Sequence, residues 1–279
     1  MKKIPDSLLL KANAGFSLVE VMVGMVIALL GIVIIFQVFS VSEGIKRTTT
    51  SGSDALQNGA SALFTLERSL KEAGYGIFSS TNLAPLPADP LGTAPVTITQ
   101  GAAANISDSI TIRYRQNWDF GSFPPDPVVF PSATPPALTV ETISIQINVS
   151  NGHPEARLLS DVNSVISDGI VLLKAEYGTD TNGNGVIDAN EWTQAVPANV
   201  LTVYAVRIAV VARSDQPEKP SVAGGTCDTT TVFPVWIDSA NVPLDLSGNI
   251  GLTAGDDWKC YRYKAFETTV PLRNVIWRT

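Results

Sequence analysis

The chain has 279 residues, of which 45% are hydrophobic, and its 26 acidic residues outnumber its 19 basic ones to give a formal net charge of −7. Because it contains no basic patch or arginine-rich run, we expect no nucleic-acid partner. The one histidine, His153, and the absence of glycine-rich nucleotide loops, GxSxG and HExxH sequences exclude most enzyme classes, so we expect no catalytic site.

The N-terminus is a short basic leader, MKKIPDSLLLKANAG, followed by an apolar run over residues 16–36. Every residue of this run is apolar or small except Ser17 and Glu20. As a helix the run would span about 31 Å, which is enough to cross a bilayer. The lysines that precede it favour a cytoplasmic N-terminus. A charge at the centre of such a helix costs about 2.5–3.5 kcal/mol on insertion scales, so Glu20 calls for an explanation.

The string GFSLVE, with the basic leader before it and the apolar run after it, resembles the signal of type IV prepilins. The resemblance implies that a prepilin peptidase cuts after Gly15 on the cytoplasmic face and methylates the new N-terminus, Phe16. It also implies that Glu20 acts in subunit assembly, by pairing with the N-terminal amine of a neighbouring helix. A plain signal anchor with Glu20 near the lipid headgroups is the alternative.

One long helix is predicted over about residues 16–72. Glycines and a run of threonines near residues 44–53 predict a bend or local melting there, and the glycines of AGYG at 73–76 end the helix. In its second half, apolar residues recur at three- and four-residue steps, which predicts an amphipathic helix packed on a globular head. The residues of this stripe are Leu56, Ala60, Leu63, Leu66 and Leu70.

The resulting organisation has four parts: a leader at 1–15, a transmembrane and polymerisation helix at 16–40, an amphipathic stem at 41–76 and a β-rich head at 77–279. We expect a single-pass protein of the inner membrane with a periplasmic head. After assembly, the resemblance implies a location in the pilus at the cell surface.

The head alternates proline-rich stretches with strands. Residues 80–137 predict long surface loops around one strand at 109–115. These elements predict an antiparallel sheet packed on the helix, an α+β arrangement. Further strands are predicted at 142–150, 169–178 and 203–213, with alternation again at 262–277.

The segments ERSLKEAGYGI, AVRIAVVARS and FETTVPLRNV resemble the PilW family of minor pilins. The resemblance implies the type IV pilin fold and a structural subunit that joins other major and minor pilins through its N-terminal helix. The implied partners are the prepilin peptidase and an inner-membrane assembly platform, and the implied role lies in priming the pilus or at its tip. A pseudopilin of type II secretion and a membrane-anchored, calcium-dependent adhesin remain the alternatives.

The stretch DTNGNGVIDANE at 180–191 has the spacing of an EF-hand calcium loop. Gly185 falls where the loop turns sharply, and hard oxygen ligands suit Ca²⁺. We expect Glu191 to bind through both oxygens and the affinity to be modest; the alternative is a hairpin turn whose acids are only solvated. The expected ligands are Asp180, Asn182, Asn184, the carbonyl of Val186, Asp188 and Glu191.

Two cysteines, Cys227 and Cys260, are too few for a zinc site and too far apart for a CxxC motif. For a head outside the cytoplasm, we expect them to form a disulfide. Two separately buried thiols are the alternative.

Overall fold

Two compact units make up the chain, and they divide between Thr49 and Thr50. The computed structural model describes residues 15–75, 77, 94–115, 138–150, 153–161, 164–218, 220, 224–237, 244–246 and 258–276.

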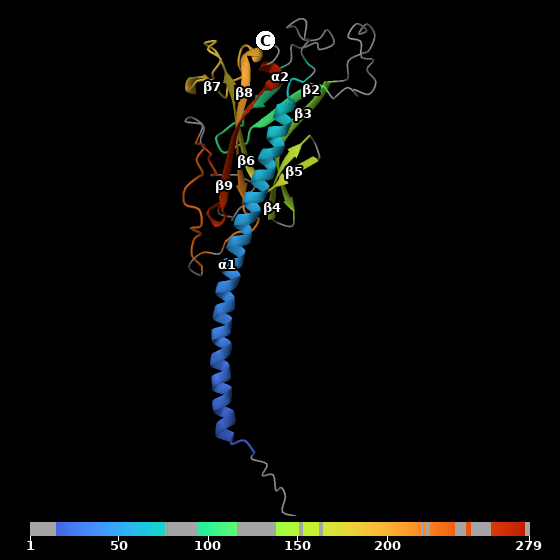
Figure 1. Ribbon diagram of the computed structural model, residues 1–279. Coiled ribbons are helices and arrows are strands. Elements are labelled where there is room, and N and C mark those ends of the chain that lie inside the picture. The colour runs from blue at the N-terminus through green and yellow to red at the C-terminus, as the bar shows by residue number, and fades with distance from the viewer. Residues whose placement is uncertain are drawn as a thin grey trace, which may run out of the picture. The chain divides into compact units, whose positions relative to one another are not determined.

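Helix α1 spans Leu18–Glu72 without interruption (Figure 1). The local melting expected near 44–53 is wrong, since every residue there is helical. The hydroxyl of Thr49 donates to the carbonyl of Ile45 (2.9 Å), so this side chain is satisfied inside the helix rather than opening it. The helix ends as predicted, because Gly74 takes the left-handed conformation with φ of 80°.

In the first unit, the described residues consist of the start of α1 and the three residues before it. This part of α1 is mainly apolar, and its large hydrophobic side chains, from Leu18 to Ile45, are exposed. By length and composition it is long and apolar enough to cross a membrane.

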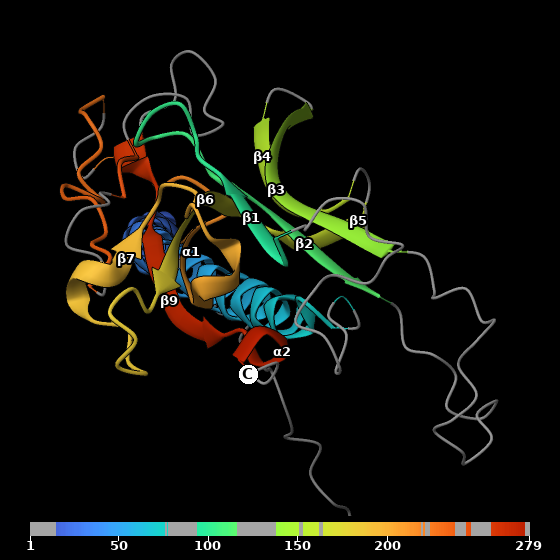
Figure 2. The same cartoon turned by 90° about the horizontal axis from the view of Figure 1, so that it is seen from above.

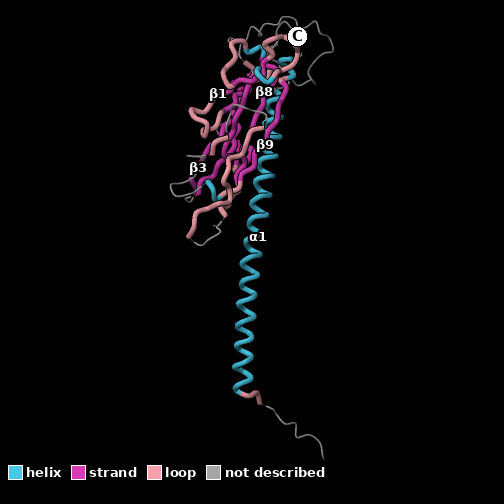
Figure 3. Tube along the Cα trace, turned by 90° about the vertical axis from the view of Figure 1, so that its left-hand side faces the viewer, coloured by secondary structure: helices cyan, strands magenta, loops and turns pink. Residues whose placement is uncertain are grey.

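The second unit combines the rest of α1 with two antiparallel sheets (Figure 3). The five-stranded sheet has the order β1-β2-β3-β4-β5, and the four-stranded sheet has the order β7-β6-β8-β9. The strands are β1 (Val96–Thr99), β2 (Ser109–Arg115), β3 (Leu138–Ser150), β4 (His153–Ser160), β5 (Ser164–Asp168), β6 (Ile170–Thr179), β7 (Trp192–Thr193), β8 (Val203–Arg213) and β9 (Tyr263–Pro271). The short helices are η2 (Ala189–Glu191), η3 (Val200–Thr202), η4 (Trp258–Cys260) and α2 (Arg273–Ile276).

The α+β class and the antiparallel arrangement are confirmed, and so are β2, β6 and β8. Four strands were not predicted, namely β1, β4, β5 and the two-residue β7. β1 is four residues long, and β4 begins HPE, so neither carries the alternation of a longer strand. The single predicted sheet is in fact two sheets, because which strands pair is decided by long-range contacts.

A shared core lies where α1 meets both sheets, which flank the second half of the helix when seen from above (Figure 2). The predicted helix stripe is only partly right. Leu66 and Leu70 are fully buried, but Leu56 is 49% exposed and Ala60 is also exposed. Small residues face the sheets over the first turns of this segment instead, and they let the strands come close. The buried residues of α1 are Ser51, Ala55, Gly59, Ala62, Leu66, Ser69 and Leu70.

The opposite face of the four-stranded sheet carries a second cluster. Leu173 and Ile208 point to the shared core, whereas Leu172 and Ala209 point to the other face, as expected for successive residues of a strand. Trp236, from the segment after β8, covers that face. Both faces of β6 and β8 are therefore buried, which explains their nearly continuous apolar sequences.

The C-terminal end of the described chain caps the stem helix. The side-chain amide of Asn274, in α2, donates to the carbonyls of Lys71 (3.2 Å) and Ala73 (3.1 Å). These carbonyls lie at the end of α1, where no further helical turn supplies donors. The helix end is thus held by a residue about 200 positions away in the sequence.

Candidate functional site

The peptide bond between Gly15 and Phe16 lies just outside α1. Residues 15–17 are not helical, and the helix begins at Leu18. The side chain of Phe16 is 81% exposed. An exposed bond outside regular helix is accessible to a peptidase.

Glu20 lies in the first turn of α1. A carboxylate there faces the positive end of the helix dipole, which partly offsets its charge. The side chain is exposed, so it is available to another molecule. No further acidic or basic residue occurs in the helix before Glu43.

The loop after β6 folds around the carboxylate of Asp180. Its Oδ1 accepts hydrogen bonds from the backbone N–H groups of Gly183 (2.7 Å) and Asn184 (3.1 Å), and its Oδ2 accepts one from Gly185 (2.8 Å). Gly183 and Gly185 both have positive φ, at 73° and 81°. The chain can therefore wind tightly about the first acidic residue, as the calcium-loop spacing predicts.

Three further side chains converge on one point of this loop. The side-chain amides of Asn182 and Asn184 both donate to Oδ2 of Asp188, at 3.0 and 3.1 Å. These residues are the third, fifth and ninth positions of the predicted loop. The oxygen and nitrogen of a carboxamide occupy interchangeable places, so each Asn can present either a donor or an acceptor to its neighbour.

Glu191 closes the loop and is only 4% exposed. Its Oε1 accepts hydrogen bonds from the Thr181 hydroxyl (2.6 Å) and from the backbone N–H groups of Thr181 (2.8 Å) and Asn182 (3.2 Å). Its Oε2 accepts one from the backbone of Asp188 (2.9 Å). These hydrogen bonds lower the pKa of Glu191 from 4.5 to about 2. The bond from the Thr181 hydroxyl has the largest effect, and the bond from the Asp188 backbone has the next largest. Glu191 was expected to bind through both oxygens; in this arrangement both already accept hydrogen bonds from the loop.

The donor set suits a hard cation, since it consists of carboxylate, amide and carbonyl oxygens. Among the described residues, no three His, Cys, Asp or Glu side chains gather as a metal site. Any site in this loop therefore depends on the two Asn side chains and on the carbonyl of Val186 as well as on its acids.

The residue after Glu191 connects the loop to the sheet in a way that the sequence did not predict. The ring of Trp192 lies 4.5 Å from Cζ of Arg207, and the Arg207 guanidinium also pairs with Glu176. Glu176 and Arg207 are only 2% and 8% exposed. In the sequence, this pair could have been inferred only from the presence of charged residues within the apolar strands β6 and β8, because charges at such positions imply a buried pair.

The disulfide is present, with Sγ of Cys227 and Sγ of Cys260 at 1.98 Å. It closes a segment that includes Trp236 and η4.

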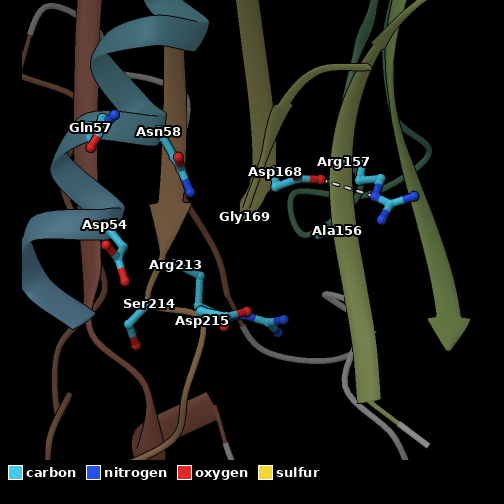
Figure 4. A pocket seen from close by; sticks show the side chains of 10 residues that line it. All are labelled: Asp54, Gln57, Asn58, Ala156, Arg157, Asp168, Gly169, Arg213, Ser214 and Asp215. Atoms are coloured by element: carbon cyan, nitrogen blue, oxygen red, sulfur yellow. Dashed lines mark hydrogen bonds and ion pairs between the residues drawn. The ribbon is translucent and has the colours of Figure 1, made fainter. Parts of the chain in front are cut away.

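A polar cavity of about 390 Å³ lies between α1, the middle of β4, the end of β5 and the end of β8 (Figure 4). Asp54, Asp215 and Arg213 line it, and on its rim Arg157 Nε pairs with Oδ1 of Asp168 at 2.9 Å. The residues that line it carry both signs of charge and include no aromatic ring, so they favour no one class of ligand.

Two family models match separate segments of the chain. The family model of type IV pilus-assembly protein W matches residues 135–274, half of the chain, and the prokaryotic N-terminal methylation motif matches residues 10–36. A type IV-like pilin from Thermus thermophilus is a structural neighbour with 14% sequence identity and a TM-score of 0.37, covering 80% of this chain and 96% of that one. A search of curated proteins found no match.

Proposed function

This chain belongs to the family of type IV pilus-assembly protein W, and we propose that it is a minor pilin that joins the pilus through its N-terminal helix. The observation that carries the proposal is the combination of the family match over the head with the methylation motif over the start of α1. Such a subunit is structural and needs no catalytic site.

Processing is the first step of this function. We propose that a prepilin peptidase cuts between Gly15 and Phe16 and methylates Phe16, with the leader in the cytoplasm and the head on the far side of the inner membrane. The exposed, non-helical bond at residues 15–16 supports this step. Intact-mass measurement of the membrane-extracted protein tests it. We expect the mass of residues 16–279 plus one methyl group, whereas the full-length mass would contradict the proposal.

Glu20 is proposed to guide docking between subunits. In lipid its charge is costly, and the N-terminal amine of a neighbouring processed pilin would compensate it. Glu20→Ala should leave insertion and cleavage unchanged but strongly reduce the amount of protein in sheared pili. Glu43→Ala is the matched control, because Glu43 is a second exposed carboxylate on the same helix. Equal incorporation of both variants would rule out this function of Glu20.

We propose that the loop at 180–191 binds Ca²⁺. The side chains of Asp180, Asn182, Asn184 and Asp188 and the carbonyl of Val186 would supply its ligands, and the bound ion would neutralise the carboxylates that the loop brings together. Glu191 remains a candidate ligand through Oε2, which accepts one hydrogen bond, whereas Oε1 accepts three.

Calcium binding is tested by thermal unfolding. At 10 mM Ca²⁺ and a dissociation constant of about 10⁻⁴–10⁻³ M, the stabilisation would be about 1.4–2.7 kcal/mol. The melting temperature should therefore rise by a few degrees relative to chelator. Asp188→Asn should reduce that rise, and Asp215→Asn, which changes an exposed carboxylate outside the loop, should not. No rise in the wild-type protein would remove the calcium proposal.

The place of the subunit in the filament is proposed to be the priming complex or the tip. Quantitative co-purification tests it: the protein should be found with sheared type IV pili, at a small fraction of the amount of the major pilin. Recovery with type II secretion components would instead make it a pseudopilin. Loss of calcium-dependent cell attachment, with piliation unchanged in a deletion strain, would favour the adhesin.

A further inference from the structure

We propose that calcium in the loop at 180–191 controls how firmly residues 227–237, the first part of the disulfide-closed segment, are held on the head, and that Arg207 transmits the effect. This inference rests on the calcium site of the proposed function and adds what that site would regulate. It is carried by contacts that join the loop to the segment through one buried guanidinium.

Arg207 stands between the two regions. It projects from β8, is 8% exposed and pairs with Glu176, its cross-strand neighbour on β6. Its Cζ lies 4.5 Å from the ring centroid of Trp192 and 5.7 Å from that of Trp236. Both distances fall within the range of a cation–π interaction. One side chain thus contacts the residue that ends the calcium loop and a residue inside the disulfide-closed segment.

On the loop side, Trp192 cannot move independently of the loop. It directly follows Glu191, whose carboxylate holds both ends of the loop. Its ring also packs where position 178 has no side chain: a Cβ on Gly178 would lie 2.7 Å from Trp192 Cζ3 and 2.9 Å from Ile187 Cδ1. Ile187 precedes Asp188, so the loop and the indole ring share one packing site. A cation that stiffens the loop would therefore also fix the Trp192 ring over Arg207.

On the segment side, Trp236 is the buried anchor. It is 2% exposed, whereas its neighbours Val235 and Ile237 are 70% and 81% exposed. Among the described residues, none accepts a hydrogen bond from its indole N–H, although that atom is buried. Burying an unsatisfied donor opposes docking of the ring. The docked state of this part of the segment is therefore sensitive to small changes in what Trp236 packs against.

These contacts link two equilibria, namely binding of calcium to the loop and docking of the segment around Trp236 on the head. With the loop filled, Trp192 and Arg207 are held in place and Trp236 packs against a fixed surface. With the loop empty, the loop moves more, Arg207 is less well fixed, and the segment around Trp236 opens more often. Since linkage is reciprocal, undocking of the segment would weaken calcium binding by the same factor.

Hydrogen exchange on the full-length protein in detergent tests the proposal, with 10 mM Ca²⁺ compared with chelator. Backbone exchange of residues 230–237 should slow by about fivefold or more when calcium is bound, since allosteric coupling usually lies in the range of 5- to 150-fold. Titration calorimetry of the same samples measures calcium binding separately. Absence of binding heat would remove the calcium site itself; binding without slower exchange would overturn the coupling while leaving the site intact.

Arg207→Lys is the diagnostic variant, because lysine keeps the charge beside Glu176 but lacks the planar group that stacks on tryptophan. The Arg207→Lys variant should still bind calcium, but hydrogen exchange of residues 230–237 should no longer slow when calcium binds. Arg157→Lys, at an exposed ion pair, should behave as the wild type does. Trp192→Leu removes the loop-side ring and should have the same effect as Arg207→Lys, which keeps the test open if the latter fails to fold. Wild-type coupling in either variant would overturn the proposal.

Discussion

The ring of Phe266 on β9 occupies the space that a side chain at Gly59 on α1 would need. A Cβ at position 59 would lie 2.0 Å from Phe266 Cε2 and 2.8 Å from Cζ. This close approach is where the stem helix and the four-stranded sheet meet. It explains why the buried face of the helix begins with Ser51, Ala55 and Gly59 rather than with larger residues.

Gly59→Ala should therefore destabilise the head. Overpacking of this kind costs roughly 1–3 kcal/mol, and the better helix propensity of alanine returns at most about 1 kcal/mol. Urea unfolding of the full chain in detergent measures the difference. Gly52→Ala on the same helix is the control, because a Cβ there meets no atom within 4 Å. It should be neutral or stabilising, and Phe266→Leu should rescue the first variant. Equal unfolding midpoints for the two alanine variants would contradict the packing argument.

Lys174→Met should be among the most damaging single changes in the head. Lys174 Nζ lies 3.1 Å from Oδ1 of Asp108, and their side chains are only 4% and 0% exposed. Asp108 also joins the two sheets, since its backbone N–H donates to the carbonyl of Leu173 and its Oδ2 accepts from the backbone of Ala175. Removing the lysine leaves a buried carboxylate without its counter-charge, at a cost of roughly 3–5 kcal/mol.

Chemical denaturation of this variant should be compared with Arg157→Met. That change breaks the ion pair between Arg157 and Asp168, in which the two side chains are 35% and 67% exposed. It should lower the free energy of unfolding by only about 0–1 kcal/mol. If both variants lost the same stability, the buried pair would not be what joins the sheets.

The stability of the loop should depend on pH through Glu191. Its pKa is lowered from 4.5 to about 2, chiefly by the hydroxyl of Thr181, so the folded state favours the ionised carboxylate. The stabilisation is therefore fully present above pH 4.5 and is lost as the pH falls through about 2. Thr181→Val removes the main donor, so its melting temperature in chelator should lie below the wild-type value at neutral pH. The two curves should converge as the pH approaches 2, and a difference that stayed constant with pH would contradict this origin.

Cys227→Ser with Cys260→Ser should lower the stability of the head. The loop-entropy relation gives about 3.5–4 kcal/mol for a sequence separation of 33. Denaturant midpoints of the oxidised wild type and the double variant measure this. Reductant should shift the midpoint of the wild type and leave the variant unchanged. Coincident midpoints for the oxidised protein and the variant would show that the disulfide adds no stability.

Much of the local structure could be predicted because it depends on short patterns. The strand predicted at 203–213 coincides with β8, and the glycine after α1 ended the helix as expected. The stripe on α1 was misjudged at Leu56, because periodicity reports which residues are apolar and not how close the partner comes. Strands such as β5, with the polar sequence SVISD, are held mainly by their neighbours and carry little signal of their own.

The sequence alone determined the methylation motif, the apolar helix, the position of Glu20 and the spacing of oxygens at 180–191, because each of these is encoded in a continuous stretch of chain. Only the tertiary structure decided that there are two sheets, that Glu191 closes its loop through hydrogen bonds, and that Arg207 contacts both Trp192 and Trp236. The two Arg207 contacts join residues 15 and 29 positions apart, through packing of the guanidinium on aromatic rings. Such contacts depend on how strands are placed in space, which no local pattern specifies.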